Sequence, residues 1–180
     1  QYEIVQTGRT NPFIAGVMEI DPTAVVVSKL EGNGNIEQAM SQTQDMIQAH
    51  PDINIFYGAS ADHALGALAA LEAAGRGKAV NGKVLTEIVV GTDATEAELI
   101  KVFDPSSSFK ITQGLQPAVN GAAEVDLMVQ VLQGKVKMDE YHVVNTYNKF
   151  MTYWLTTIDQ AQEFLSYQYY SKFDLKGSLK

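Results

Sequence analysis

The hydrophobic and polar positions of this chain follow two alternating periodicities. Short runs of consecutive apolar residues predict strands that are covered on both faces. Longer segments with apolar residues three and four positions apart predict amphipathic helices. Strands are predicted at residues 2–5, 24–28, 53–57, 85–90, 109–112 and 142–144, and helices at 11–20, 36–49, 62–74, 95–103, 118–132 and 160–169. This alternation is typical of an α/β fold with three layers, α/β/α, around a mostly parallel sheet.

The segment with the clearest chemistry is residues 51–71, which predict a short strand, a small turn and an alanine-rich helix. Gly58 lets the backbone turn tightly, and either Ser60 or Asp62 can cap the helix that follows. Open α/β sheets bind small ligands at the carboxyl ends of their strands. The segment therefore predicts one corner of a binding site.

The character of the chain changes after Lys135. Six of the eight tyrosines follow residue 140, and the single tryptophan, Trp154, lies among them. Such side chains bury an apolar body and keep a polar tip, so this tail is predicted to pack against another surface. We therefore predict a ligand-binding lobe at residues 1–144 and a crossover with an aromatic tail at 145–180, whose last residues, 172–180, are expected to be frayed. Residues 76–83 are predicted to form a polar, glycine-bearing loop.

Composition and charge exclude several classes of function. A net charge of −8 with scattered Lys and Arg argues against a nucleic-acid partner, and no apolar run is long enough to predict a membrane span. The chain has no cysteine, and its three histidines, His50, His63 and His142, lie on different predicted elements. We therefore expect no metal and no cofactor. No Ser, His and Asp can be grouped into a triad, so an enzyme is disfavoured.

Three sequence motifs resemble one family of binding proteins. The motifs are AHPDINIFYGASADHALGALAALEAAGR, EIVVGTD and ITQGLQP. They resemble the type I periplasmic sugar-binding proteins of the ribose and galactose group, whose lobe also forms the effector domain of LacI-type regulators and the autoinducer-2 receptors. The resemblance extends from about Arg9 to Val144. In that family two similar lobes are joined by three crossovers, and the ligand is held in the cleft between them. The resemblance implies that this chain is the carboxy-terminal lobe with its final crossover, without its amino-terminal partner lobe.

Two candidate ligand residues follow predicted strands. A sugar presents hydroxyls that both donate and accept, so carboxylate, amide and guanidinium groups suit its binding site. Asp93 comes directly after the strand at 85–90, and in the family the matching aspartate accepts hydrogen bonds from the ligand. The alternative is that Asp93 caps the helix that begins near Thr95. Gln113 matches the family's ligand-binding glutamine, with an ordinary loop amide as the alternative.

Four further candidates are implied by the resemblance. Arg9 stands four residues before Phe13, as the family's ligand arginine does, and its planar fork suits neighbouring hydroxyls; a surface arginine is the alternative. Ser60 lies where ribose-type proteins often carry asparagine, and Ser60 with Asp62 matches a Ser-x-Asp pattern of the autoinducer receptors. Either of these two residues can instead serve as a helix cap. Asn33 lies where many members place an aromatic wall, and this departure leaves the ligand class open.

These observations predict a periplasmic, or lipid-anchored extracellular, solute-binding protein that delivers a sugar or polyol to the permease of an ABC transporter. A receptor module for a membrane sensor kinase or chemoreceptor is the first alternative. The effector domain of a LacI-type regulator is the second, and it requires a DNA-binding segment upstream. An export signal, or neighbouring transporter or kinase genes, would separate the three.

Overall fold

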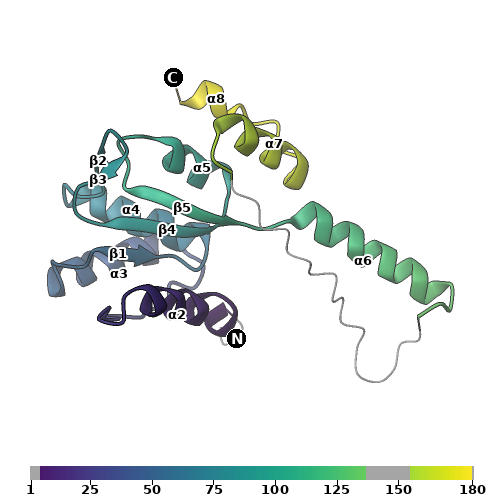
Figure 1. Cartoon of the computed structure of the whole chain (residues 1–180), viewed down its shortest axis with the longest axis horizontal. Helices are drawn as coiled ribbons and strands as arrows, with labels where there is room; N and C mark the ends of the chain where they lie inside the picture. Colours follow the sequence, from purple (N-terminus) through teal and green to yellow (C-terminus); the bar gives the residue numbers. More distant parts are fainter. Residues whose placement is uncertain (1–4, 137–154, 180) are drawn as a thin grey trace. The chain divides into compact units, whose positions relative to one another are not determined.

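The computed structural model describes residues 5–136 and 155–179 (Figure 1). The chain divides into two compact units, of which the first extends to Gly114 and the second begins at Leu115. The predicted domain boundary at residues 144–145 lies outside the described residues and stays a prediction.

A parallel sheet of three strands forms the centre of the first unit (Figure 1). The strands are β1 (Ile55–Tyr57), β4 (Ile88–Asp93) and β5 (Phe109–Gly114), in the order β1-β4-β5. They confirm the strands predicted at 53–57, 85–90 and 109–112, with shifted ends. Because all three strands run in the same direction, their carboxyl ends meet at one edge of the sheet.

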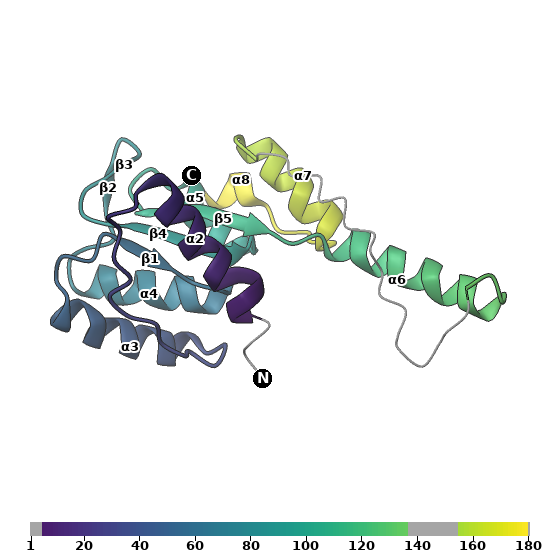
Figure 2. The same ribbon diagram turned by 60° about the horizontal axis from the view of Figure 1, so that its bottom comes forward.

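Helices flank this sheet, as the apolar periodicity predicts. They are α3 (Ile36–Ala49), α4 (Ala61–Ala73) and α5 (Glu96–Phe103). Figure 2 shows α4 beside the sheet and α3 on the outer side of α4. The two helices pack closely at Gly66, where a Cβ would lie 2.5 Å from the carbonyl oxygen of Ile36. Glycine is therefore required there by packing and not by a special backbone angle.

The core of the first unit lies between α4 and the sheet. Phe109, Val89 and Leu71 are completely buried, and Leu68 is 1 % exposed. These large apolar side chains form one cluster with Phe56 of β1. Removing that much apolar surface from water is the main stabilising contribution to this unit.

Two predictions about the sheet's surroundings are wrong. Residues 24–32 contain no regular element, and Val25 is 78 % exposed. A strand exists only where a neighbour completes its hydrogen bonds, and no described residue joins 24–28 to β1. The loop at 76–83 instead contains a hairpin, β2 (Ala79–Val80) and β3 (Lys83–Val84). Asn81 and Gly82 form its two-residue turn, both with positive φ (51° and 77°), as such hairpins require.

The amino-terminal segment is helical where the structure describes it. A short π-helix, η1 (Gln6–Thr10), leads into α2 (Asn11–Ile20), which confirms the predicted helix at 11–20. Residues 2–4 of the strand predicted at 2–5 lie outside the described residues. Val5 is already in the helical conformation.

The second unit consists of helices in its described part. They are α6 (Pro117–Leu132), α7 (Ile158–Gln168) and α8 (Leu175–Ser178). The helices predicted at 118–132 and 160–169 are confirmed; α7 begins at Ile158 because Thr157 and Gln160 form a capping box. The strand predicted at 142–144 lies outside the described residues.

The expectation that residues 172–180 are frayed is wrong for α8. The side-chain amide of Gln162 in α7 forms two hydrogen bonds with the backbone of this segment. Its Nε2 donates to the carbonyl of Phe173 at 2.8 Å, and its Oε1 accepts from the N–H of Leu175 at 2.8 Å. Leu175 itself is completely buried. Gln162 precedes its two partners by 11 and 13 residues in sequence, so the composition of residues 172–180 does not indicate these hydrogen bonds.

Candidate functional site

The last residue of β4, Asp93, lies at the edge of the sheet where all three strands end. It occupies an unusual backbone conformation with φ of 113°, and Ala94 after it has φ of 52°. Non-glycine residues rarely adopt such angles, and the surrounding contacts must hold them. The parallel register places Asp93 opposite Gly114 and Thr92 opposite Gln113.

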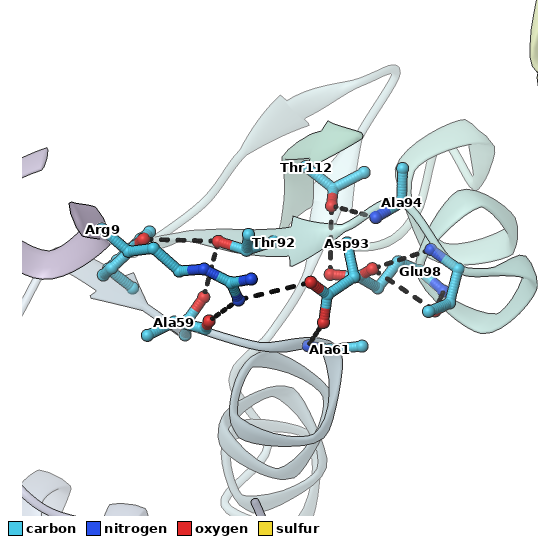
Figure 3. Close-up of polar contacts among 11 residues, drawn as sticks. Arg9, Ala59, Ala61, Thr92, Asp93, Ala94, Glu98 and Thr112 are labelled. Atoms are coloured by element: carbon cyan, nitrogen blue, oxygen red, sulfur yellow. Dashed lines mark hydrogen bonds and ion pairs between the residues drawn. The ribbon is translucent and has the colours of Figure 1, made fainter. Parts of the chain in front are cut away.

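The carboxylate of Asp93 contacts two other elements (Figure 3). Its Oδ2 accepts a hydrogen bond from the N–H of Ala61, the first residue of α4, at 3.1 Å. Its Oδ1 accepts from Nη1 of Arg9 at 3.3 Å. Asp93 thus caps α4 across the sheet edge. The alternative that it caps α5 is wrong, since Thr95 is the N-cap of that helix.

Arg9 reaches this edge from η1, at the other end of the lobe's sequence. Its Nη1 also donates to the carbonyl of Ala59 at 2.6 Å, so the guanidinium bridges the turn after β1 and the end of β4. The Arg9 side chain is 30 % exposed and that of Asp93 is 21 % exposed. The structure therefore brings together two of the predicted site residues and leaves both accessible. We call Arg9, Asp93 and Ser60 the strand-end site.

Ser60 occupies the N-cap position of α4 but does not act as its side-chain cap. Its Oγ is buried and has no hydrogen-bond partner among the described residues. The nearby Asp62 is an exposed residue of the helix's first turn and not its N-cap. Capping by either side chain is therefore wrong, because the carboxylate of Asp93 takes that role. Gly58 permits the close turn, since a Cβ there would overlap the backbone of Ala64.

The two remaining candidates, Gln113 and Asn33, are exposed. Gln113 lies on β5 in register with Thr92. Asn33 lies in a turn with φ of 51°, and its Nδ2 donates to Oε1 of Gln38 at 3.2 Å. The turn is attached to α4, since the N–H of Gly34 donates to Nε2 of His63 at 3.0 Å. The ligand roles of both residues stay predictions, as does that of Asp62.

An aromatic pair lies on the first unit beside these strands. Phe13 of α2 stacks on Tyr57, the last residue of β1, with ring centroids 4.1 Å apart and an interplanar angle of 9°. The Tyr57 hydroxyl lies 3.3 Å from Oγ1 of Thr92 on β4. Sequence reasoning used Phe13 only to align Arg9. The pair places two aromatic rings beside the carboxyl end of β1.

Sequence reasoning missed Glu98, a buried residue in the first turn of α5, close to Asp93. Its Oε2 accepts from the N–H of Thr95 at 2.9 Å, and its Oε1 accepts from Oγ1 of Thr112 at 3.1 Å. The side chain fits because position 91 is glycine, where a Cβ would overlap Oε1. The spacing of Thr95 and Glu98 is that of a capping box and could have indicated this contact.

Burial governs the ionisation of Glu98. Desolvation raises its pKa from an ordinary value of 4.5 to about 7, against the opposing hydrogen bonds from Thr95 and Thr112. The negative charge of Asp93 raises the pKa further. Both the ionised and the protonated forms are therefore populated near neutral pH.

We predict that the parent protein loses stability as the pH rises through about 7, and that Glu98→Gln does not. The folded protein binds this proton more tightly than the unfolded chain, so the favourable contribution is complete below pH 4.5 and is lost as the pH rises through about 7. Above that range the variant should exceed the parent by about 2 kcal/mol in free energy of unfolding. Urea denaturation of both proteins at several pH values measures their free energies of unfolding. If the variant and the parent differed by the same amount at every pH, the prediction would be wrong.

No cluster of three potential metal ligands occurs in the part of the chain that the structure describes. Within the same residues, no helix combines the length and apolar character needed to cross a membrane.

The fold defines the class: one lobe of an α/β protein, with polar groups at the carboxyl edge of a parallel sheet, where open α/β folds bind ligands. Residues 3–136 match the model of the periplasmic binding protein domain. Because this match covers more than half of the chain, the chain belongs to the periplasmic binding protein family. This family is typically non-enzymatic.

Two solved structures are similar in fold. A periplasmic sugar-binding protein from Pseudomonas fluorescens shows 21 % identity and a TM-score of 0.54, covering 67 % of this chain and 34 % of that one. An ABC transporter periplasmic solute-binding protein from Actinobacillus succinogenes 130z, with bound D-allose, shows 25 % identity and a TM-score of 0.53, covering 72 % and 43 %. The chain thus spans less than half the length of either. No curated protein matches the sequence.

Proposed function

We propose that this chain is one lobe of a periplasmic solute-binding protein that captures a sugar or sugar-like molecule between two lobes and delivers it to an ABC transporter. The observation that carries the proposal is the accessible Arg9–Asp93 pair at the carboxyl edge of the sheet, 3.3 Å apart. The relative from Actinobacillus succinogenes 130z, which is named as an ABC transporter protein and holds D-allose, supports it.

The chemistry of the strand-end site suits a ligand with neighbouring hydroxyls. The Asp93 carboxylate accepts from hydroxyl groups, and the Arg9 guanidinium donates to them in a fixed plane. Ser60 Oγ can both donate and accept and has no described partner, but it is itself buried, so contact with a ligand requires that the turn expose it. A ligand that bridges these groups satisfies polar atoms that are partly withdrawn from water.

Binding in two lobes implies closure on the ligand. The lobe described here supplies one set of hydrogen bonds, and a second lobe supplies the other, so only the closed form makes both. The closed form is what a transporter recognises in this proposal. A single lobe is then expected to bind weakly because it offers half of the contacts.

Isothermal titration calorimetry of the two-lobed protein with D-allose, D-ribose, D-galactose and the corresponding polyols tests this function. We expect at least one of these to bind with micromolar affinity or better, and the lone 180-residue chain to bind the same sugar at least 100-fold more weakly. Heat signals absent for the whole panel would contradict the proposal. Equal affinity of the lone chain would contradict the two-lobed mechanism. Loss of sugar uptake when the permease gene is removed distinguishes transport from signalling.

A further inference from the structure

The carboxylate of Glu98 adjoins the strand-end site but cannot touch a ligand. The residue is completely buried, and its oxygens accept hydrogen bonds from Thr95 and Thr112. Figure 3 shows the contact with Thr112. A buried carboxylate without a paired cation is costly, so a packed fold would be more stable with an apolar side chain here. Any contribution of Glu98 to binding must therefore act through neighbouring groups.

The neighbouring group is the strained turn between β4 and α5. Asp93 and Ala94 both have positive φ, a conformation that non-glycine residues rarely adopt and that the surrounding contacts must hold. The N–H of Ala94 donates to Oγ1 of Thr112 at 3.1 Å, and that hydroxyl donates onward to Glu98. The N–H of Thr95 donates to Glu98 directly. The two backbone N–H groups that follow Asp93 are thus fixed by one carboxylate.

We propose that Glu98 is a positioning residue: through Thr112 and the N–H of Thr95 it holds the turn that directs the Asp93 carboxylate toward Arg9 and toward a bound ligand. The identity of the ligand as a sugar or polyol rests on the proposed function. The geometric part, that Glu98 controls the orientation of Asp93, does not.

Few charged groups among the described residues lie on the elements that pack against Glu98. Asp93 on β4 is the one charged group among the described residues whose field contributes to the raised pKa of Glu98, and Asp93 is itself paired with Arg9 of η1. Glu72 and Lys101 pair with each other at 2.9 Å. The other titratable groups on elements packed against α5, including α5 itself, are Glu96, Asp62, His63 and Lys110.

Ionisation of Glu98 changes what its oxygens can do. The carboxylate accepts both from Thr95 and from Thr112, whereas the protonated acid carries a donor on one oxygen. A proton on Oε1 requires the Thr112 hydroxyl to accept from Glu98 in place of donating to it, and the reoriented hydroxyl then shares its lone pairs between Glu98 and the N–H of Ala94. Ligand hydroxyls that donate to Asp93 reduce the negative field at Glu98 and so favour its ionised form. By reciprocity, the ionised form favours the ligand, and affinity should rise as the pH passes through about 7.

The first test uses the two-lobed protein with D-allose as the probe. We expect the parent to bind about fivefold more tightly at about pH 8.5 than at about pH 5.5, and Glu98→Gln to bind equally at both. Glu37→Gln is the matched control, because Glu37 is an exposed acid in the first turn of another helix. It should keep the parent's pH profile. A Glu98→Gln variant with the parent's affinity and pH profile would overturn the proposal.

A second test needs no ligand. In the ¹⁵N-labelled chain, the amide resonances of Ala61, Ala94 and Thr95 should shift with a common midpoint near pH 7, and the shifts should vanish in Glu98→Gln. Ala61 is decisive, since its N–H donates to Asp93 and not to Glu98. If these amides titrate together while no sugar binds, the proposed function fails and the positioning role stands. If D-allose binds but Ala61 does not follow Glu98, the positioning role fails and the function stands.

Discussion

Replacing Asp93 with alanine is expected to weaken sugar binding by the two-lobed protein about 100-fold. The substitution removes the acceptor that ligand hydroxyls would meet, and it leaves the guanidinium of Arg9 without its carboxylate at 3.3 Å. It also removes the cap from the N–H of Ala61, so a loss of about 1 kcal/mol in stability should accompany the loss of affinity. Calorimetry with the tightest sugar of the panel, together with thermal denaturation, measures both effects.

Asp45→Ala is the control for this substitution. Asp45 is an exposed acid on α3, so its removal changes the net charge equally without touching the strand-end site. We expect its affinity to stay within twofold of the parent. If Asp93→Ala bound the sugar as tightly as Asp45→Ala does, the assignment of Asp93 to the ligand would be wrong.

Replacing Arg76 with methionine is expected to destabilise the chain by about 3 to 5 kcal/mol, because it leaves the buried carboxylate of Glu87 without its cation. The Nε of Arg76 lies 2.7 Å from Oε2 of Glu87, whose side chain is completely buried. The same guanidinium donates to the carbonyls of Pro51 and Ile53, each at 2.8 Å. It therefore joins the end of α4, the start of β4 and the segment that precedes β1. Urea denaturation followed by circular dichroism measures the loss.

Lys101→Met provides the matched comparison, because Lys101 and Glu72 form an ion pair whose side chains are 33 % and 43 % exposed. Its removal should cost less than about 1 kcal/mol. The double variant Arg76→Met with Glu87→Leu should recover part of the stability, since it no longer buries an unpaired charge. Equal losses for Arg76→Met and Lys101→Met would show that burial does not govern this pair.

Sequence periodicity predicted the three strands of the parallel sheet and the helices that flank them. The helix predicted at 36–49 appears with the expected ends. The helix predicted at 118–132 also appears within one residue of its expected ends, although none of its residues is buried among the described residues. The strand expected at 24–28 did not form, because an apolar run indicates burial but not the neighbour that completes a ladder. The short α8 was missed for the converse reason. Its position depends on the amide of Gln162, a contact that no local pattern shows.

For the candidate site, position along strands was more informative than residue type. Asp93 was predicted from its place after a strand, and the structure adds that it pairs with Arg9, which is 84 residues away in sequence. The capping roles given to Ser60 and Asp62 were wrong because the cap comes from another strand, which local sequence cannot reveal. Glu98 was missed because a charged residue in the first turn of a helix is usually solvated. Only the missing Cβ of Gly91 creates space for it.

The outer side of β1 has a consequence for handling the lobe by itself. Among the described residues β1 is hydrogen-bonded only to β4, and Ile55 on it is 40 % exposed. Backbone groups along such an edge can recruit a strand from another molecule, which is a common start of aggregation. Work with the lobe by itself at high concentration is therefore expected to require conditions that suppress pairing along β1.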